Sequence, residues 1–150
     1  LMDQLLQPYS IYQEKGYHIH VDLSPVTLHG DEKQLGQVIL NLLNNAIKHT
    51  GEDGNVYLTG APTPEGRYRI QVTDTGKGID PEEIPYIWDR YYKARNAKDK
   101  LMGTGIGLSI VKEVLNAHHL PYGVTSTPGK GSTFWLEAEI TPIHLEQNCD

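Results

Sequence analysis

Two asparagines on one helix are the first residues of this chain whose types and spacing could do chemistry. The stretch 31–50 carries apolar residues at i, i+3, i+4 and i+7, which predicts an amphipathic helix. Asn41 and Asn45 lie one turn apart beside the apolar stripe, and Lys48 follows them. An amide oxygen can bind a hard cation such as Mg²⁺, and a lysine ammonium can contact a phosphate. A polar helix shoulder with solvated amides is the competing interpretation of the same pattern.

A glycine-bearing turn, DTGKGI from Asp74, directly follows a predicted strand at 67–73. A carboxylate at a strand end can accept a hydrogen bond from an exocyclic amine such as adenine N6. Gly76 and Gly78 allow the backbone to turn sharply and to approach a flat ring. A plain turn is the alternative, because this short motif is common in proteins.

Two further glycine segments follow, GTGIGLS from Gly103 and GKGSTF from Gly129. The first segment precedes a predicted helix, so its free backbone amides and the helix N-terminus could bind an anion. The spacing of its glycines matches neither the dinucleotide-binding fingerprint nor the P-loop. A glycine-rich hinge is the competing interpretation of GTGIGLS, and an ordinary turn is the competing interpretation of GKGSTF. Thr133, in the second of these segments, could line a pocket. Together the four segments supply a metal ligand, a base reader and phosphate-binding amides, which predicts a Mg·ATP site.

Composition limits the class of protein. The 150 residues suit one domain, and 38% hydrophobic with 21% charged residues is ordinary for a soluble globular chain. Cys149 is the only cysteine, which excludes a disulfide framework and a thiolate metal site. The net charge of −6 argues against nucleic acid as a partner. No apolar run approaches the roughly 20 residues that span a bilayer. Because Leu1 is not a natural start residue, the chain is expected to be an excised fragment.

Alternating apolar residues predict strands, and helical spacing of apolar residues predicts helices. Strands are expected at 17–23, 56–58, 67–73, 122–126 and 133–140, and a turn is expected at 61–66. In the first strand, Ile19, Val21 and Leu23 share the face that is expected to point inward. Helices are expected at 31–50, from Asp80, where Asp-Pro-Glu-Glu is a strong start signal, and from Gly105. The predicted fold class is α+β. It is a two-layer α/β sandwich with a mixed, mostly antiparallel sheet of about five strands, about three helices on one face and a flexible ATP lid.

In this order, the four segments resemble the catalytic and ATP-binding domain of bacterial sensor histidine kinases, the kinases of two-component signalling. That domain belongs to a wider ATPase superfamily with gyrase, a heat-shock chaperone and mismatch-repair ATPases. The resemblance runs from about Tyr17 to Ile140 and includes the aromatic segment IWDRYYK. It implies a connection to a missing dimerisation domain at 1–16, a catalytic domain at 17–141 with its lid at about 80–103, and a tail at 142–150.

The resemblance also implies a role for each matching residue. Asn45 matches the asparagine that binds Mg²⁺, Asn41 lies near the metal and the phosphates, and Asp74 matches the aspartate that reads adenine N6. The residues implied in catalysis are Asn41, Asn45, Lys48, Arg90 and Lys93. The residues implied in nucleotide binding are Asn41, Asn45, Lys48, His49, Asp74, Gly76, Gly78, Ile79, Tyr92, Lys93, Gly103, Thr104, Gly105, Ile106, Gly107, Leu108 and Thr133.

Several positions depart from the usual family pattern. His49 stands where a tyrosine often covers the adenine. Trp88 and Tyr91 stand where phenylalanines are usual, and as aromatics they are still expected to anchor this segment to the body of the domain. Lys93 stands where an arginine commonly contacts the γ-phosphate, which keeps the charge but loses the two-pronged contact. The pair His118-His119 replaces a usual His-Gly pair, and both histidines are expected at the surface.

Asn41 occupies the position where hydrolysing relatives carry a catalytic glutamate. An amide cannot act as that base, so the resemblance implies phosphoryl transfer to an acceptor rather than hydrolysis. None of the seven histidines lies in the family's phosphoacceptor context, a histidine followed by an acidic residue on an amphipathic helix. The acceptor is therefore expected on another domain.

The resemblance implies two partners, which are the dimerisation and phosphoacceptor domain of the same homodimeric protein and a response regulator. Neither nucleic acid nor direct membrane contact by this fragment is expected. The expected setting is the cytoplasmic part of a membrane-anchored sensor kinase. Three alternatives stay open: a degenerate kinase or nucleotide sensor that binds ATP without transfer, a stand-alone ATPase, and a serine kinase with the same fold.

Overall fold

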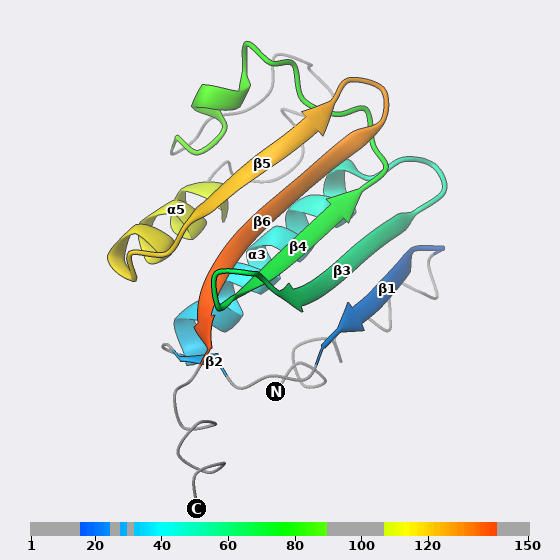
Figure 1. Ribbon diagram of the computed structural model, residues 1–150. Coiled ribbons are helices and arrows are strands. Elements are labelled where there is room, and N and C mark those ends of the chain that lie inside the picture. Colours follow the sequence, from blue (N-terminus) through cyan, green and yellow to red (C-terminus); the bar gives the residue numbers. More distant parts are fainter. Residues whose placement is uncertain (1–15, 25–27, 30–31, 90–106, 141–150) are drawn as a thin grey trace, which may run out of the picture.

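The computed structural model describes residues 16–24, 28–29, 32–89 and 107–140 of the chain (Figure 1). The described strands are β1 (His18–Leu23), β2 (Leu28–His29), β3 (Asn55–Pro62), β4 (Arg67–Asp74), β5 (Tyr122–Thr127) and β6 (Gly131–Ile140). The described helices are α3 (Glu32–His49), α5 (Gly107–Ala117) and the 3-10 helix η2 (Ile84–Tyr86). Figure 1 shows α3 and α5 side by side on one face of the sheet.

The described strands form one six-stranded mixed sheet in the order β1-β3-β4-β6-β2, with β5 also paired to β6. β1 runs parallel to β3, and the other described pairings are antiparallel. Within the central strands, Val56 lies opposite Asp74 and Val72 lies opposite Phe134. The predicted α+β fold, a two-layer sandwich with a mixed and mostly antiparallel sheet, is confirmed.

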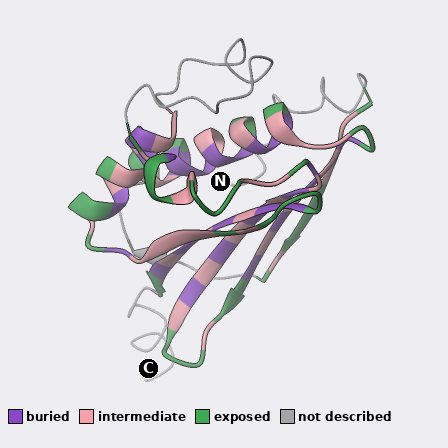
Figure 2. Ribbon diagram, turned by 90° about the horizontal axis from the view of Figure 1, so that it is seen from above, coloured by how far each residue is buried: buried purple, intermediate pink, exposed green. Residues whose placement is uncertain are grey.

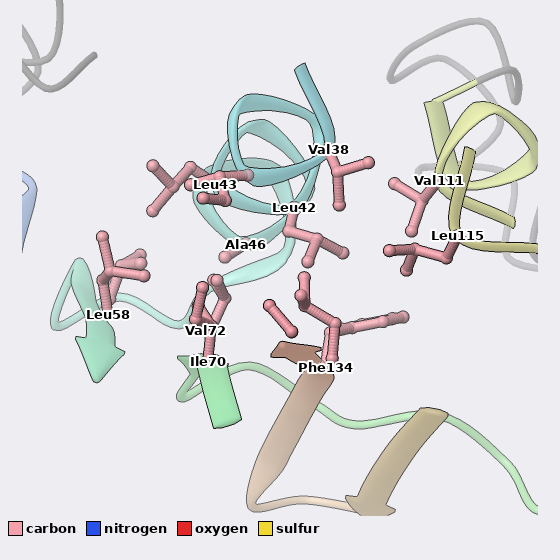
Figure 3. Packing of buried hydrophobic residues seen from close by; sticks show 14 of the residues in the cluster. Val38, Leu42, Leu43, Ala46, Leu58, Ile70, Val72, Val111, Leu115 and Phe134 are labelled. Carbon is pink, nitrogen blue, oxygen red and sulfur yellow. The ribbon is translucent and has the colours of Figure 1, made fainter. Parts of the chain in front are cut away.

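Helix α3 forms because its apolar residues recur at helical spacing and can be buried on one side. Figure 3 shows Val38 and Leu42 of α3 on the side of Val111 and Leu115 of α5, and all four side chains are at most 1% exposed. Full burial of such a side chain contributes about 1.5–3 kcal/mol. The sheet adds Leu58, Ile70, Val72 and Phe134 to the same core.

Strand β4 alternates residue by residue between the two faces of the sheet, as its sequence predicts. Its Tyr68, Ile70 and Val72 are buried against the helix side. Arg69 lies on the other face, where its guanidinium group stacks 4.0 Å from the ring centroid of Trp135 in β6. Figure 2 shows the resulting alternation of buried and half-buried residues along the strands. The sheet therefore has one packed face and one solvated face.

The predicted helix from Asp80 is wrong. Residues 80–89 form a run of turns closed by hydrogen bonds between residues i and i+3, and within it only Ile84–Tyr86 form a 3-10 helix. Pro85 explains the difference. It has no N–H to donate, and its ring would clash with the turn before it in an α-helix, so the start signal at Pro81 cannot propagate.

The strand predictions are confirmed with shifted ends. β3 extends to Pro62, into the segment predicted as a turn, and the two-residue β2 was not predicted because it is too short to show a period. In β1 the predicted inward residue Val21 is 45% exposed. The reason is its place in an edge strand, since α3 packs over β3 and β4 rather than over β1.

Helix α5 ends with a histidine in the left-handed conformation. Leu120 N–H donates to Leu115 O (2.9 Å) and His119 N–H donates to Asn116 O (3.1 Å), the two bonds of a Schellman motif. His119 has a φ of 56°, at the position where the family pattern has glycine. A residue with a Cβ costs about 1 kcal/mol in this conformation. The surface prediction is confirmed for His119, whereas His118 is half-buried.

Candidate functional site

The polar side of α3 borders its buried side. Asn41 and Asn45 are half-buried, and Lys48 is exposed. The helical spacing places these three side chains next to Val38 and Leu42, the residues that face α5 in Figure 3. The residues predicted to contact the metal and the phosphates therefore lie along one edge of α3, on the side of α5.

The amide of Asn41 has an unsatisfied nitrogen. Its Nδ2 is buried and has no hydrogen-bond partner within the part of the chain that the structure describes. Leaving such a donor unpaired costs about 1–3 kcal/mol, so a ligand that accepts from it would be favoured. An N–H donor suits a phosphate oxygen or a metal-bound water.

The donor set of this edge also fits a Mg·ATP phosphate group. Asn45 offers an amide oxygen one turn from Asn41. The described residues contain no cluster of three or more histidine, cysteine or acidic side chains that could hold a metal. Amide, phosphate and water oxygens together are a set of ligands that Mg²⁺ accepts.

The DTGKGI turn packs directly on the last turn of α3. Gly76 is buried, and a Cβ added there would collide with the carbonyl oxygen of His49. Only glycine permits two backbones to come this close. This contact brings Asp74 and Gly76 to the helix that carries Asn45, so two segments predicted to bind one nucleotide are adjacent.

Thr50 joins the end of α3 to the same turn through hydrogen bonds. Its hydroxyl donates to Asn55 O (2.5 Å) and accepts from Thr75 N–H (3.3 Å). The Thr75 hydroxyl donates to Asp53 Oδ1 (2.5 Å), and this bond lowers the pKa of the exposed Asp53 carboxyl. Because Thr75 directly follows Asp74, the position of the Asp74 carboxylate is tied to the helix end.

Asp74 is an ionisable group in a buried position. It is only 3% exposed, and its Oδ1 accepts a hydrogen bond from Gly76 N–H at 2.9 Å. Burial raises the pKa of the Asp74 carboxyl above its ordinary value, while the Gly76 N–H and the charge of His49 act in the opposite direction. A buried acceptor of this kind would be stabilised by an exocyclic amine.

The β5–β6 hairpin holds the turn from the opposite side. Gly129 N–H donates to Lys77 O (2.7 Å), and Ile79 N–H donates to Ser126 Oγ (2.7 Å). Gly78 has a φ of 77°, and a Cβ there would lie 2.5 Å from a carbonyl oxygen of the hairpin. The turn is thus fixed between α3 and the hairpin.

The structure does not bring Thr133 to the Asp74 carboxylate. The Thr133 hydroxyl lies 2.9 Å from that of Thr73, its partner in β4, and this pair is on the solvated face of the sheet. The side chain next to Asp74 on the packed face is Ser132, which is 5% exposed and whose N–H also acts to lower the pKa of Asp74. The sequence reasoning missed Ser132, which is adjacent to the residue it selected.

Helix α5 begins at Gly107, the last glycine of GTGIGLS. Its first turn has no acidic side chain, so the partial positive charge of its N-terminus is not compensated there. Leu108 and Ile79 are partly buried and pack against the core. The other predicted residues on this side lie outside the described residues: Arg90, Tyr92, Lys93, Gly103, Thr104, Gly105 and Ile106.

Trp88 anchors the aromatic segment to the body of the domain, as predicted. Its ring meets Tyr122 edge-on at a centroid distance of 5.0 Å and Phe134 at 5.6 Å. The neighbouring Ile87 is buried in the core. Tyr91, the second predicted aromatic anchor, lies outside the described residues.

The chain matches a known family over most of its length. The model of the Histidine kinase-, DNA gyrase B-, and HSP90-like ATPase family matches residues 30–142. The phosphate regulon sensor protein PhoR of Pseudomonas aeruginosa is 37% identical over 122 residues, which are 80% of this chain and 27% of PhoR. The sensor histidine kinase YkoH of Bacillus subtilis is 34% identical over 129 residues, 85% of this chain and 28% of YkoH. The chain belongs to this ATPase family and is a catalytic and ATP-binding domain of the sensor histidine kinase type.

Solved structures share the fold. Full-length ShkA, whose crystal structure is a complex with AMPPNP, matches 94% of this chain and 30% of its own, with a TM-score of 0.75 and 32% identity. The mycobacterial sensor histidine kinase MprB matches 93% of this chain and 93% of its own, with a TM-score of 0.76 and 25% identity. The chain spans less than a third of the length of PhoR, YkoH and ShkA.

Proposed function

We propose that this domain transfers the γ-phosphoryl group of Mg·ATP to a histidine on a separate dimerisation domain, which then passes it to a response regulator. One observation carries the proposal: the Asp74 turn is packed and hydrogen-bonded onto the end of the helix that carries the asparagines. A base reader and a phosphate-binding edge are thereby held in one unit. Family membership supports ATP as the nucleotide, and PhoR and YkoH are named as sensor proteins.

At the phosphate end, the residues of α3 divide the contacts. Asn45 is the proposed ligand of Mg²⁺, which when bound neutralises charge on the phosphates. Asn41 donates from its unpaired Nδ2 to a phosphate oxygen or a bound water, and Lys48 contacts a phosphate as a point charge. Arg90 and Lys93 supply further positive charge to the triphosphate.

At the base end, Asp74 accepts a hydrogen bond from adenine N6. Gly76 and Gly78 keep the backbone of the turn flat enough for the ring to lie against it, and Ile79 adds an apolar contact. His49, at the end of α3, covers the ring from the helix side. These contacts orient the nucleotide, so that its phosphates extend toward Asn41 and Asn45.

The nature of Asn41 supports transfer over hydrolysis. Attack by water needs a base, and an amide cannot take a proton. A neutral imidazole nitrogen already has a free lone pair, so it forms the N–P bond as the bond from phosphorus to the leaving ADP oxygen breaks. The domain then has to position its substrates and balance charge.

The partner domains and the cellular setting belong to the same proposal. The acceptor histidine lies on the dimerisation domain of the same homodimeric protein, and the domain works in the cytoplasm. Neither α-helix that the structure describes combines the length and the apolar character needed to cross a bilayer.

Transfer of labelled phosphate from ATP to the dimerisation domain of the parent protein tests the proposal. The wild-type chain should label that domain in a Mg²⁺-dependent reaction, and its acceptor histidine changed to alanine should prevent labelling. ATP binding without labelling would favour a degenerate kinase or nucleotide sensor. Steady release of phosphate without any acceptor would favour a stand-alone ATPase.

A further inference from the structure

We propose that the solvated face of the sheet is an interaction surface for a second copy of this chain. This face lies opposite the helices α3 and α5 (Figure 1), so the proposal does not depend on the proposed function. It rests on the order in which charged and aromatic side chains stand along β4 and β6.

The composition of this face is typical of a protein–protein interface. Its side chains on β4 and β6 are those of Arg67, Arg69, Gln71, Thr73, Thr133, Trp135, Glu137 and Glu139. None of the described strands contains a lysine. Interfaces between proteins are enriched in arginine and tryptophan and depleted in lysine, whereas an ordinary solvated surface is rich in lysine.

Arg69 is held in place at the centre of this face. Its guanidinium group stacks 4.0 Å from the ring centroid of Trp135, and its Nε lies 3.8 Å from Glu137 Oε2. Trp135 packs over Gly123 of β5, where an added Cβ would lie 2.8 Å from the ring. A guanidinium group that is already fixed by stacking loses little conformational freedom when it forms another ion pair. Arg69 is therefore preorganised for an acidic side chain of a partner.

The charges of this face stand in two columns. Arg67 and Arg69 lie in β4, and directly opposite them in β6 lie Glu139 and Glu137. A two-fold axis along the strands, midway between β4 and β6, would place β4 of one copy over β6 of the other. Two sheets in aligned packing keep their strand directions within about 30°, so this correspondence holds near the centre of the patch.

This axis brings opposite charges together across the whole patch. Arg69 of each copy meets Glu137 of the second copy, and Arg67 meets Glu139 of the second copy. Because a two-fold interface is self-complementary, each of these contacts occurs twice. Packing β4 over β4 would instead oppose arginine to arginine. The register of the two strands thus favours one arrangement of two copies.

The size of the patch predicts a weak dimer. At the usual strand spacing and rise per residue, the face over β3, β4, β6 and β5 covers about 450 Å² in each copy. A total of about 900 Å² is in the range of weak, transient association, for which we expect a Kd of about 0.1–1 mM. The helices of both copies point away from this interface, so the two candidate nucleotide sites stay accessible.

Analytical ultracentrifugation of the whole chain, from about 10 μM to about 1 mM, measures the association. Arg69→Glu should weaken the dimer by at least about tenfold, because two attractive contacts become repulsive, and Glu137→Arg should weaken it similarly. Lys33→Glu makes the same change of charge on an exposed residue of α3. It is the matched control and should keep the wild-type Kd.

Mixing the two variants gives the sharpest criterion. An equimolar mixture of Arg69→Glu and Glu137→Arg should associate at least as tightly as the wild type, since every charge then meets its opposite across the axis. The double variant Arg69→Glu/Glu137→Arg should dimerise by itself. Variants that had only lost stability would not be rescued by mixing.

A wild-type chain that stays monomeric at about 1 mM would overturn the proposal and leave this face to solvent or to a different protein. A dimer that Arg69→Glu does not weaken would also overturn it, because another surface would then hold the copies together. If the charge-reversed variants do not fold, the salt dependence of the wild-type dimer decides. NaCl at about 1 M should weaken it several-fold, and an unchanged Kd would overturn the proposal.

Discussion

The two ends of the candidate site differ in how completely their polar groups are bonded. The turn that begins at Asp74 is fixed on both sides, by Thr50 at the end of α3 and by Ser126 in β5. The edge of α3 instead carries a buried Asn41 nitrogen without a partner in the described chain. An end whose polar groups are already hydrogen-bonded can bind a ligand without reorganisation. An end with an unpaired polar group gains its missing hydrogen bond from the ligand. In the proposed function, the base end is therefore held rigid and the phosphate end is completed on binding.

The largest effect is expected at the phosphate end. Asn45→Ala removes the proposed metal ligand and should abolish Mg²⁺-dependent transfer, a loss of at least about 100-fold. The measurement is labelling of the parent's dimerisation domain with ATP. Gln37→Ala, an exposed residue of the same helix, is the matched control and should transfer normally. Transfer by Asn45→Ala at the wild-type rate would remove this residue from the metal site.

At the base end, Asp74→Asn should weaken ATP by roughly 10- to 100-fold, because a hydrogen bond to a charged acceptor is lost. The loss should be selective, since an amide can also donate to the guanine carbonyl. Competition binding with ATP and GTP measures both constants. An equal loss for the two nucleotides would contradict a role of Asp74 in reading the base.

The bonds behind the base end should matter less. Thr50→Val keeps the shape but removes the hydroxyl, which leaves Thr75 N–H and Asn55 O unpaired. We expect the free energy of unfolding to fall by about 1–2 kcal/mol and the affinity for ADP to fall a few-fold. Urea denaturation and calorimetry measure the two effects. Thr50→Ser keeps the hydroxyl and should have the stability and the ADP affinity of the wild type, and Thr59→Val in β3 is the control. If Thr50→Val changed neither quantity, the turn would hold its position without this hydroxyl.

Asp74→Asn should also stabilise the empty domain at neutral pH. The carboxyl has an ordinary pKa of 3.8, and burial raises it in the folded state. Between 3.8 and the raised value the folded protein binds more protons than the unfolded one, so stability falls as the pH rises through this window and stays lower above it. The variant should therefore have the higher Tm at pH 7 and an equal Tm below pH 3.8 in nucleotide-free thermal scans. A lower Tm at pH 7 would mean that the Gly76 N–H bond outweighs burial.

The smallest effect is expected at the C-terminus of α5, outside both ends of the candidate site. His119→Gly removes a Cβ from a left-handed residue and should raise the free energy of unfolding by about 0.5–1 kcal/mol. Urea denaturation measures the gain, and nucleotide affinity should not change. His119→Ala keeps the Cβ and should show no gain. A loss of stability in His119→Gly would reveal a contribution from the imidazole itself.

Much of the fold could be predicted because apolar residues recur at regular spacing along its helices and strands. Helix α3 and strand β4 were predicted from regular spacing of apolar residues over seven or more positions. The helix from Asp80 was predicted from a start signal, which is local. Whether such a start continues depends on the next turn, and Pro85 lies there.

The candidate site was predictable where a residue type belongs to a motif, as for Asn45 and Asp74. Thr50 and Ser126 were missed because a single hydroxyl residue has no spacing to recognise, and its partners are defined only by the folded chain. Ser132 was missed because a shift of one residue along a strand moves a side chain to the other face of the sheet, and the sequence does not show the register.

Strand β6 is the common neighbour of β2, β4 and β5, and it follows all three in the chain. As the protein leaves the ribosome, β4 therefore exposes an unpaired edge, and β5 has no neighbour, until the stretch from Gly131 has been synthesised. Pairings between such distant segments also slow folding. The nascent sheet is thus exposed to aggregation until its last described strand has been synthesised, and only then is the proposed nucleotide site assembled.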